Sequence, residues 1–178
     1  MSTLLPDSYW IIQGKFLAGP DPLRIPGRLP KESIDELIGI GIDAFIDLTD
    51  SYELMGASYL PLIEKLPRSD RVKYFNFPIN DRGIPTLHTM REILDLIHWL
   101  IEQQSILYLH CYSGIGRTGT VVGCYLVEEG FKGHQALQEI RFLREDLHRK
   151  WIASPETDAQ IKYVLGWKRL SSKNEILT

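Results

Sequence analysis

The sequence predicts an α/β fold in which a central, mostly parallel sheet of about four or five strands is flanked by helices. The main observation is that short apolar runs alternate along the chain with segments of helical periodicity. No internal repeat, low-complexity tract or block of like charge points to a repeat or disordered protein. The length of 178 residues, with 44% hydrophobic residues, fits one globular domain. We expect that domain to span residues 1–178, with loose tails at residues 1–9 and 171–178.

The charge balance and the cysteine count exclude several classes of protein. Lys and Arg number 20 against 23 Asp and Glu, a net charge of -3 at pH 7, which excludes a broad polycationic nucleic-acid binder. Cys111 and Cys124 are the only cysteines, which excludes a disulfide-stapled scaffold. No apolar run reaches the roughly 18 residues of a membrane span, and no signal peptide is recognisable after Met1. We expect a cytoplasmic protein with no nucleic-acid partner and no stable membrane association, and the oligomeric state stays open.

The first half of the chain predicts three strands and one clear helix. Short apolar runs predict strands at residues 10–13, 15–18 and 43–48. Apolar residues recur at helical spacing within residues 31–40, and Gly41 follows as a helix stop. The Pro- and Gly-rich residues 20–30 are typical of a loop. Residues 52–65 are expected to be partly helical, with an interruption at Pro61.

The second half predicts two more strands and four helices. The strands are expected at residues 72–77 and 106–110. Thr86 is a suitable N-cap for a long helix, and residues 118–127 are apolar on all sides, which is typical of a buried helix. Apolar stripes mark the long helix and a later one: Leu87, Met90, Leu94, Ile97 and Ile101, then Ala136, Ile140, Leu143 and Leu147. Ser154 and Pro155 are expected to begin the last helix.

The most informative segment is HCYSGIGRTG, residues 110–119, which lies between a predicted strand and the buried helix. Loop N–H groups and the positive end of the helix dipole face Cys111, and Arg117 folds back over the same hollow. Each of these three groups favours the thiolate over the thiol, so Cys111 is predicted to be a nucleophile at neutral pH. The same amides and guanidinium form a cradle for a tetrahedral dianion. We expect the substrate to bind to Tyr112, Ser113, Gly114, Ile115, Gly116 and Arg117.

This segment resembles the C-x5-R signature of cysteine-dependent protein tyrosine phosphatases, in the form of the compact dual-specificity-like branch. The resemblance implies that Cys111 attacks phosphorus and becomes a phosphocysteine, while Arg117 and the loop amides hold the equatorial oxygens. It implies that the Thr118 hydroxyl hydrogen-bonds the sulfur and helps it to leave. It also implies that His110 orients the loop through hydrogen bonds to backbone, and that the fold is protein tyrosine phosphatase-like.

The resemblance further implies a general acid on a mobile loop about 30 residues before the nucleophile. Asp81 lies 30 residues before Cys111, in the segment FPINDRGIP, with Gly83 beside it as a hinge. This segment is similar to the D-x-G-x-P form of small family members. Asp47 and Asp50 are weaker candidates, because they end an earlier strand.

The segment SPETDAQ, residues 154–160, resembles the family's late glutamine-bearing segment. Under that interpretation, Gln160 positions the hydrolytic water. The alternative is that these residues form only the solvated first turn of the last helix.

We therefore predict a metal- and cofactor-independent phosphatase that hydrolyses phosphotyrosine in proteins through a phosphocysteine, and acceptance of phosphoserine or phosphothreonine stays open. The alternative within the superfamily is a phosphoinositide or inositol-phosphate phosphatase, although the signature loop lacks the lysines typical of lipid-directed members. A non-catalytic phosphate-binding module is a third hypothesis. Residues 114–119 also fit G-x-G-x-x-G, but the expected acidic residue after a following strand is missing, which disfavours a dinucleotide site.

Two further groups of residues have ordinary structural interpretations. Cys124 is predicted to be an inert core thiol. A basic cluster near the C-terminus is expected to be a solvated face, with the rim of an anionic-substrate site as the alternative: Arg141, Arg144, His148, Arg149 and Lys150.

Overall fold

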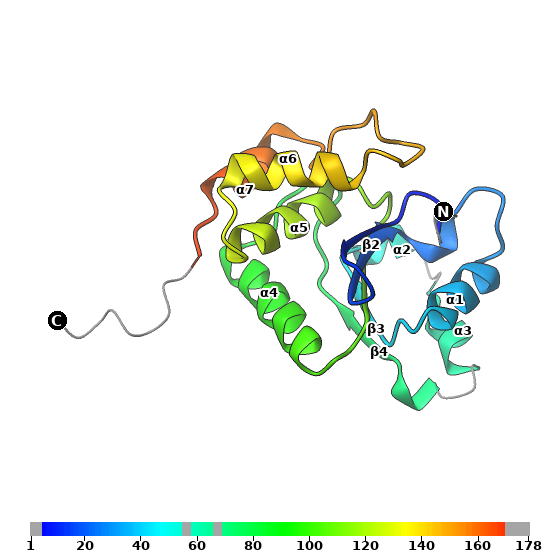
Figure 1. Cartoon of the computed structure of the whole chain (residues 1–178). Coiled ribbons are helices and arrows are strands. Elements are labelled where there is room, and N and C mark those ends of the chain that lie inside the picture. The colour runs from blue at the N-terminus through cyan, green and yellow to red at the C-terminus, as the bar shows by residue number, and fades with distance from the viewer. Residues whose placement is uncertain (1–4, 55–57, 66–68, 170–178) are drawn as a thin grey trace.

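The computed structural model of the chain describes residues 5–54, 58–65 and 69–169 (Figure 1). The strands are β1 (Tyr9–Ile12), β2 (Phe16–Pro20), β3 (Ala44–Asp47), β4 (Lys73–Asn76) and β5 (Leu107–Cys111). They form a 5-stranded sheet in the order β1-β2-β5-β3-β4. β1 is antiparallel to β2, whereas the other neighbours are parallel. The predicted sheet is therefore confirmed, and β5 lies at its centre.

Helices cover both faces of this sheet (Figure 1). On one face lie α1 (Pro30–Gly39) and α3 (Leu60–Glu64); on the other lie α4 (Leu87–Glu102), α5 (Gly116–Glu128), α6 (Gly133–Leu143) and α7 (Asp158–Gly166). Three short elements complete the described fold: η1 (Pro22–Arg24), α2 (Ser51–Leu54) and η2 (Ser69–Arg71).

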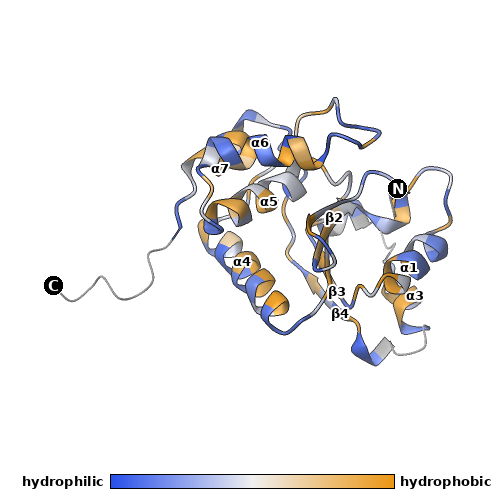
Figure 2. Cartoon of the chain, viewed as in Figure 1, coloured by the Kyte–Doolittle hydropathy of each residue, from blue (hydrophilic) through white to orange (hydrophobic). Residues whose placement is uncertain are grey.

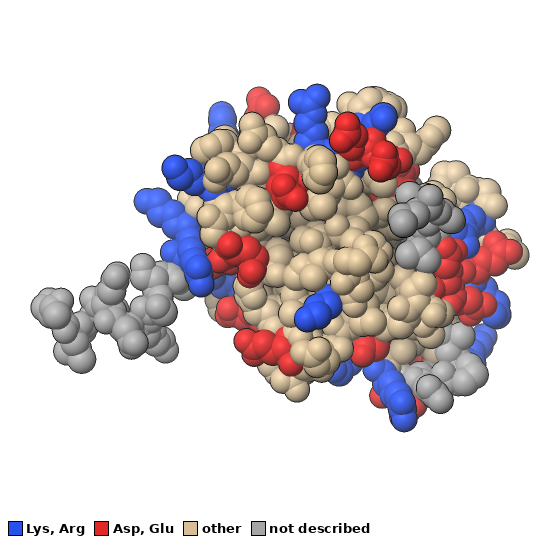
Figure 3. Space-filling view, viewed as in Figure 1, with Lys and Arg blue, Asp and Glu red and all other residues tan. Residues whose placement is uncertain are grey.

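Alternation along β5 divides the core into two layers. Leu107 and Leu109 pack with α4 and α5, whereas Tyr108 points to the opposite face and packs with α1 and α3. All five residues of β5 are buried, because both faces of this central strand are covered. Figure 2 shows hydrophobic residues on the strands between the helical layers. Figure 3 shows acidic and basic residues interspersed on the face in view.

The long helix α4 begins as predicted. The Thr86 hydroxyl accepts a hydrogen bond from the N–H of Thr89 at 3.0 Å, which caps the first turn. The buried stripe differs slightly from the predicted one, because Leu87 is 69% exposed in that first turn. The residues that face the core are Met90, Ile93, Leu94, Ile97 and Leu100.

Other helix boundaries differ from the prediction for local reasons. Pro61 lies in the first turn of α3, where its missing N–H costs no hydrogen bond, so it does not interrupt that helix. Helix α6 ends at Leu143 instead of extending to Leu147. Helix α7 begins at Asp158 and not at Ser154 and Pro155. The N-cap is Thr157, whose hydroxyl accepts from the N–H of Gln160 at 3.3 Å.

Residues 5–9 pack against the domain, where we expected a loose tail. Leu5 is fully buried, and the Ser8 hydroxyl donates to the Leu5 carbonyl at 2.6 Å. The Asp7 carboxylate pairs with Arg149 at 2.6 Å, which ties this segment to the loop after α6. The predicted tail at 171–178 lies outside the described residues, and the single-domain organisation of the chain stays a prediction. Among the described helices, none combines the length and the apolar character that a membrane span requires.

Candidate active site

The signature loop lies at the carboxyl edge of the parallel strands. Cys111 ends β5 and is paired in register with Pro20 of β2, and α5 begins at Gly116. Ligand sites of open α/β sheets lie at this edge, because loops and helix N-termini converge there. Cys111 itself is 1% exposed, so the thiol lies below the molecular surface.

Gly114 allows the loop to turn beside β2. Its φ is +70°, and a Cβ on this residue would lie 2.3 Å from the carbonyl carbon of Gly19. The loop therefore needs glycine both for backbone conformation and for close approach.

Substituting Gly114 with alanine is expected to lower both the melting temperature and the phosphate-ester hydrolysis that the signature loop predicts. Gly14 provides the matched control, since its φ is +71° and a Cβ added there would meet nothing within 4 Å. Gly14→Ala should cost about 1 kcal/mol from the positive φ alone. Gly114→Ala should cost more, because the Gly19 backbone has to move. Equal melting temperatures and activities for the two variants would contradict this account of the loop.

Arg117 is almost fully buried and is held by acidic partners. Its guanidinium forms a bidentate pair with the Glu53 carboxylate, with Nη2 2.7 Å from Oε1, and Nη2 is also 3.1 Å from an Asp81 oxygen. Nη1 donates to the Ile79 carbonyl at 3.0 Å. Burial lowers the pKa of Arg117, but the Glu53 hydrogen bond and the charges of Cys111, Glu53 and Asp81 raise that pKa above its ordinary value. Arg117 therefore stays charged at any pH at which the protein works.

Glu53 is a site residue that was not identified from the sequence. It lies in α2, 64 residues before Arg117, and its backbone carbonyl also accepts a hydrogen bond from Arg24 at 2.7 Å. The sequence offers no signal for this pair, because several acidic residues lie between β3 and β4 and none of them is marked by a motif.

The structure separates Asp81 from the weaker acid candidates. The Asp81 side chain is 64% exposed and reaches Arg117, so it lies at the mouth of the signature loop. Asp47 is buried and accepts from the hydroxyl of Tyr74 at 2.7 Å. Asp50 accepts from backbone N–H groups at the start of α2, the first at 2.9 Å. Both alternatives are therefore occupied as structural acceptors.

His110 connects the signature loop to the opposite face of the sheet. Its Nδ1 lies 3.3 Å from the Cys111 carbonyl oxygen, and its Nε2 lies 2.7 Å from the Tyr59 hydroxyl. A carbonyl only accepts, so Nδ1 carries the proton and Nε2 accepts from Tyr59 when the ring is neutral. Burial raises the pKa of Tyr59 well above its ordinary value, which keeps that hydroxyl protonated as a donor. Tyr59 was also not identified from the sequence.

The remaining loop residues differ in exposure and in partners. The Thr118 hydroxyl is buried without a hydrogen-bond partner among the described residues, so it retains a free donor next to the loop. Tyr112 is 45% exposed, and the Arg24 guanidinium lies 4.3 Å from its ring centre. The Ser113 carbonyl accepts from Arg149 at 2.9 Å. The Ile115 carbonyl accepts from the Ser154 hydroxyl at 2.7 Å.

Gln160 joins the loop of Asp81 to the start of α7. Its Nε2 donates to the Gly83 carbonyl at 3.0 Å. Its Oε1 accepts from the N–H groups of Glu156 and Thr157, both at 3.1 Å. In this conformation both carbonyl lone pairs of the side chain are used within the protein.

The second cysteine, Cys124, lies outside the signature loop, in the body of α5. Burial raises the pKa of its thiol, with the charge of Glu128 adding to the effect. We expect iodoacetamide at neutral pH to modify Cys111 and to leave Cys124 intact in the folded protein, as measured by peptide mass spectrometry. Both thiols are buried, so exposure alone does not predict this difference. Unfolded protein should react at both positions, and equal labelling in the folded state would show that the Cys111 site does not activate its thiol.

Across residues 5–54, 58–65 and 69–169, no group of three or more His, Cys, Asp or Glu side chains is arranged to hold a metal ion. The groups that the structure brings together at this edge are a thiol, a guanidinium, carboxylates and backbone amides. Thiol, guanidinium and backbone amides are the kinds of group that hold a tetrahedral anion.

Comparison with known proteins identifies the family. A family model described as Swiss Army Knife protein, DSP-PTPase phosphatase domain (PTP-SAK), matches residues 9–164. The chain belongs to the PTP-SAK family. This match confirms the predicted relationship to compact dual-specificity-like phosphatases, and it includes every site residue described above.

Curated relatives of this PTP-SAK domain include phosphatases whose names give different substrates. It is 33% identical over 98 residues to phosphatidylinositol 3,4,5-trisphosphate 3-phosphatase and protein-tyrosine-phosphatase PTEN1 of Arabidopsis thaliana, covering 54% of this chain and 23% of the relative. The domain is 25% identical over 148 residues to the tyrosine-protein phosphatase CDC14 homolog of Schizosaccharomyces pombe. That alignment covers 78% of this chain and 26% of the relative. The chain thus spans about a quarter of the length of these two relatives.

Solved structures confirm the predicted fold of the PTP-SAK domain. Tk-PTP in its active form superposes with a TM-score of 0.69 at 27% identity, covering 89% of this chain and 94% of that one. Kinase associated phosphatase (KAP) also has a TM-score of 0.69, at 22% identity over 84% of this chain and 82% of that one. At this lower identity the likeness to KAP concerns the fold alone.

Proposed function

We propose that this chain hydrolyses phosphotyrosine in proteins through a phosphocysteine on Cys111. The observation that carries the proposal is the convergence of Cys111, Arg117 and Asp81 at one edge of the sheet, with Asp81 3.1 Å from the guanidinium. A nucleophile, an anion clamp and a proton donor are the groups that the reaction needs. The family supports a phosphatase, and the tyrosine-phosphatase names of its relatives support this substrate.

In the first step, the Cys111 thiolate attacks phosphorus and the bond from phosphorus to the phenol oxygen breaks. Asp81 donates its proton to that oxygen, while Arg117 and the loop amides hold the equatorial phosphate oxygens. In the second step, water attacks phosphorus and gives a proton to Asp81, and the phosphorus–sulfur bond breaks. Thr118 donates a hydrogen bond to the departing thiolate, which its unpartnered hydroxyl is free to do.

Substrate binding has to rearrange the partners of Arg117. The guanidinium is shared between Glu53 and Asp81, so incoming phosphate competes with Asp81 for Nη2. Release of Asp81 would free its carboxyl group for proton donation, while Glu53 would keep the guanidinium plane oriented. We assign Gln160 a positioning role, through the hydrogen bond that it donates to the Gly83 carbonyl. To hold the hydrolytic water as well, its Oε1 would have to give up a hydrogen bond from the N–H of Glu156 or Thr157.

A phosphoinositide is the second candidate substrate. It is favoured by the name of the Arabidopsis thaliana relative at 33% identity, which includes both lipid and protein phosphatase activities. Against it, the residues between Cys111 and Arg117 carry no positive charge. Multiply phosphorylated headgroups would gain little there beyond the contacts of one phosphate.

The experiment compares a phosphotyrosine peptide with short-chain phosphatidylinositol phosphates, all assayed for phosphate release in EDTA. Acid quenching during turnover of radiolabelled peptide should trap label on the peptide that contains Cys111. Faster turnover of the lipid would replace the proposed substrate, and loss of all activity in EDTA would overturn the thiol mechanism. Retention of the peptide without turnover would indicate a binding module.

A further inference from the structure

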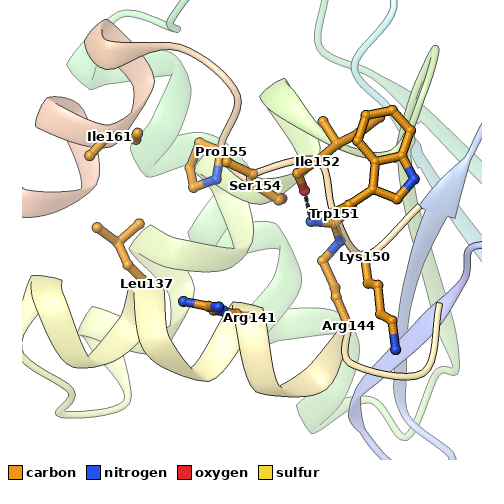
Figure 4. Close-up of a pocket in the computed structure, with 10 residues that line it drawn as sticks. Leu137, Arg141, Arg144, Lys150, Trp151, Ile152, Ser154, Pro155 and Ile161 are labelled. Atoms are coloured by element: carbon orange, nitrogen blue, oxygen red, sulfur yellow. Dashed lines mark hydrogen bonds between the residues drawn. The ribbon is translucent and has the colours of Figure 1, made fainter. Parts of the chain in front are cut away.

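A pocket lies beside the signature loop, on the side formed by α6 and α7. Its volume is about 340 Å³, which suits a small organic group. Leu137 and Arg141 project into it from α6, and the loop after that helix supplies most of the remaining wall (Figure 4). Ser154 lines this pocket, and its hydroxyl also donates a hydrogen bond to the Ile115 carbonyl. Ser154 therefore connects the pocket to the signature loop.

The pocket is lined by three basic side chains, Arg141, Arg144 and Lys150, and by no carboxylate. Arg141 and Lys150 are exposed, and neither forms an ion pair with any residue that the structure describes. The sequence predicts a solvated face for this cluster, but Arg144 is only 4% exposed. Glu145 lines an adjoining hollow together with Arg141 and Lys150, so one carboxylate lies near three basic groups, and this excess of positive charge attracts an anion.

Arg144 is buried with part of its donor capacity unused. Nη1 donates to the Ile152 carbonyl at 2.9 Å, whereas the buried Nε has no partner among the described residues. Burial lowers the pKa of Arg144, and the charges of Tyr9 and Asp7 compensate only part of this effect. A bound anion would supply that compensation.

The rest of the lining is apolar or aromatic. Leu137, Ile152, Pro155 and Ile161 contribute hydrophobic surface, and Trp151, 79% exposed, stands at the side of the pocket (Figure 4). An exposed tryptophan offers a face for stacking on a ring. A fully hydrated ion such as inorganic phosphate would leave this surface unused.

We propose that this pocket is a second binding site for an aromatic phosphate, held by Arg141, Arg144 and Lys150 at the phosphate and by Trp151 and the apolar wall at the ring. A phosphotyrosine side chain has this chemistry. The site would bind its ligand without hydrolysis, because it contains no thiol. It is independent of the proposed function, since an anion could bind here whether or not Cys111 turns it over.

The test is a titration of Cys111→Ser protein with benzylphosphonate, followed by NMR at the Trp151 indole N–H and at the signature-loop amides. Two separate saturable responses are expected. In Arg141→Gln/Lys150→Gln the Trp151 response should weaken about tenfold or more while the loop response is unchanged. Lys15→Gln removes an exposed charge at the β1–β2 turn and should change neither response.

Each outcome bears on one site. Absence of a Trp151 response, or a response equal in the double variant and in Lys15→Gln, would overturn the proposal. Inorganic phosphate binding as tightly as benzylphosphonate would overturn the aromatic part of it. A missing loop response would count against the proposed function and leave the second site standing.

Discussion

Replacing Cys111 with serine is expected to lower kcat for a small aryl phosphate by about 10⁴-fold or more. A serine hydroxyl is protonated at neutral pH and needs a general base to act as a nucleophile. The adjacent His110 cannot take that role, because its two ring nitrogens are engaged by the Cys111 carbonyl and the Tyr59 hydroxyl. The measurement is the rate of phenol release in EDTA.

Cys124→Ala is the matched control for this substitution. It removes the other thiol of the chain from the core, so it should lower stability while leaving the activity of the folded protein nearly unchanged. Activity should be compared well below the melting temperature of each variant. Substantial turnover by Cys111→Ser would contradict the assignment of Cys111 as the nucleophile. This conclusion would hold even if EDTA left the wild-type rate unchanged.

Replacing Asp81 with asparagine is expected to lower kcat by about 10²- to 10³-fold for substrates with a poorly acidic leaving group, such as phosphotyrosine. The loss should be small for 4-nitrophenyl phosphate, because its phenolate leaves without protonation. The comparison of the two substrates isolates proton donation from binding. The same pair of assays should show no change for Asp95→Asn, which alters an exposed carboxylate on α4.

The leaving-group comparison also decides between two roles that the structure allows Asp81. Its carboxylate lies 3.1 Å from Nη2 of Arg117, so it could act only by orienting the guanidinium. In that case Asp81→Asn would slow both substrates by the same factor. Equal losses would therefore reject Asp81 as the proton donor and leave it as a positioning residue for Arg117.

Features that depend on short stretches of sequence were predictable. The signature loop is recognisable because Cys111, Arg117 and the intervening glycines lie within a few residues of one another, between a strand and a helix. The N-cap of α4 at Thr86 is equally local, since the hydroxyl bonds an N–H three residues later. Strand positions followed from runs of apolar residues and agreed with the structure to within two residues at each end.

Local cues were misleading where a distant residue competes for the same side chain. Ser154 followed by proline is typical of a helix start, but its hydroxyl donates to the Ile115 carbonyl and Thr157 caps α7 instead. Similarly, Arg144 belongs to a basic cluster that predicts a solvated face, yet the loop after α6 folds back and buries this side chain. Propensity is a weak preference that tertiary contacts override.

The α/β class and the signature loop could be read from the chain, because they depend on periodicity and on residues close together in sequence, whereas Asp81 was singled out by the resemblance to the phosphatase family. Folding was needed to bring Glu53 to Arg117 and Tyr59 to His110, across separations of 64 and 51 residues. These partners come from different elements that meet only when the sheet forms, and the free energy of burying charged and polar groups selects them. No pattern in the chain marks such residues before folding places them together.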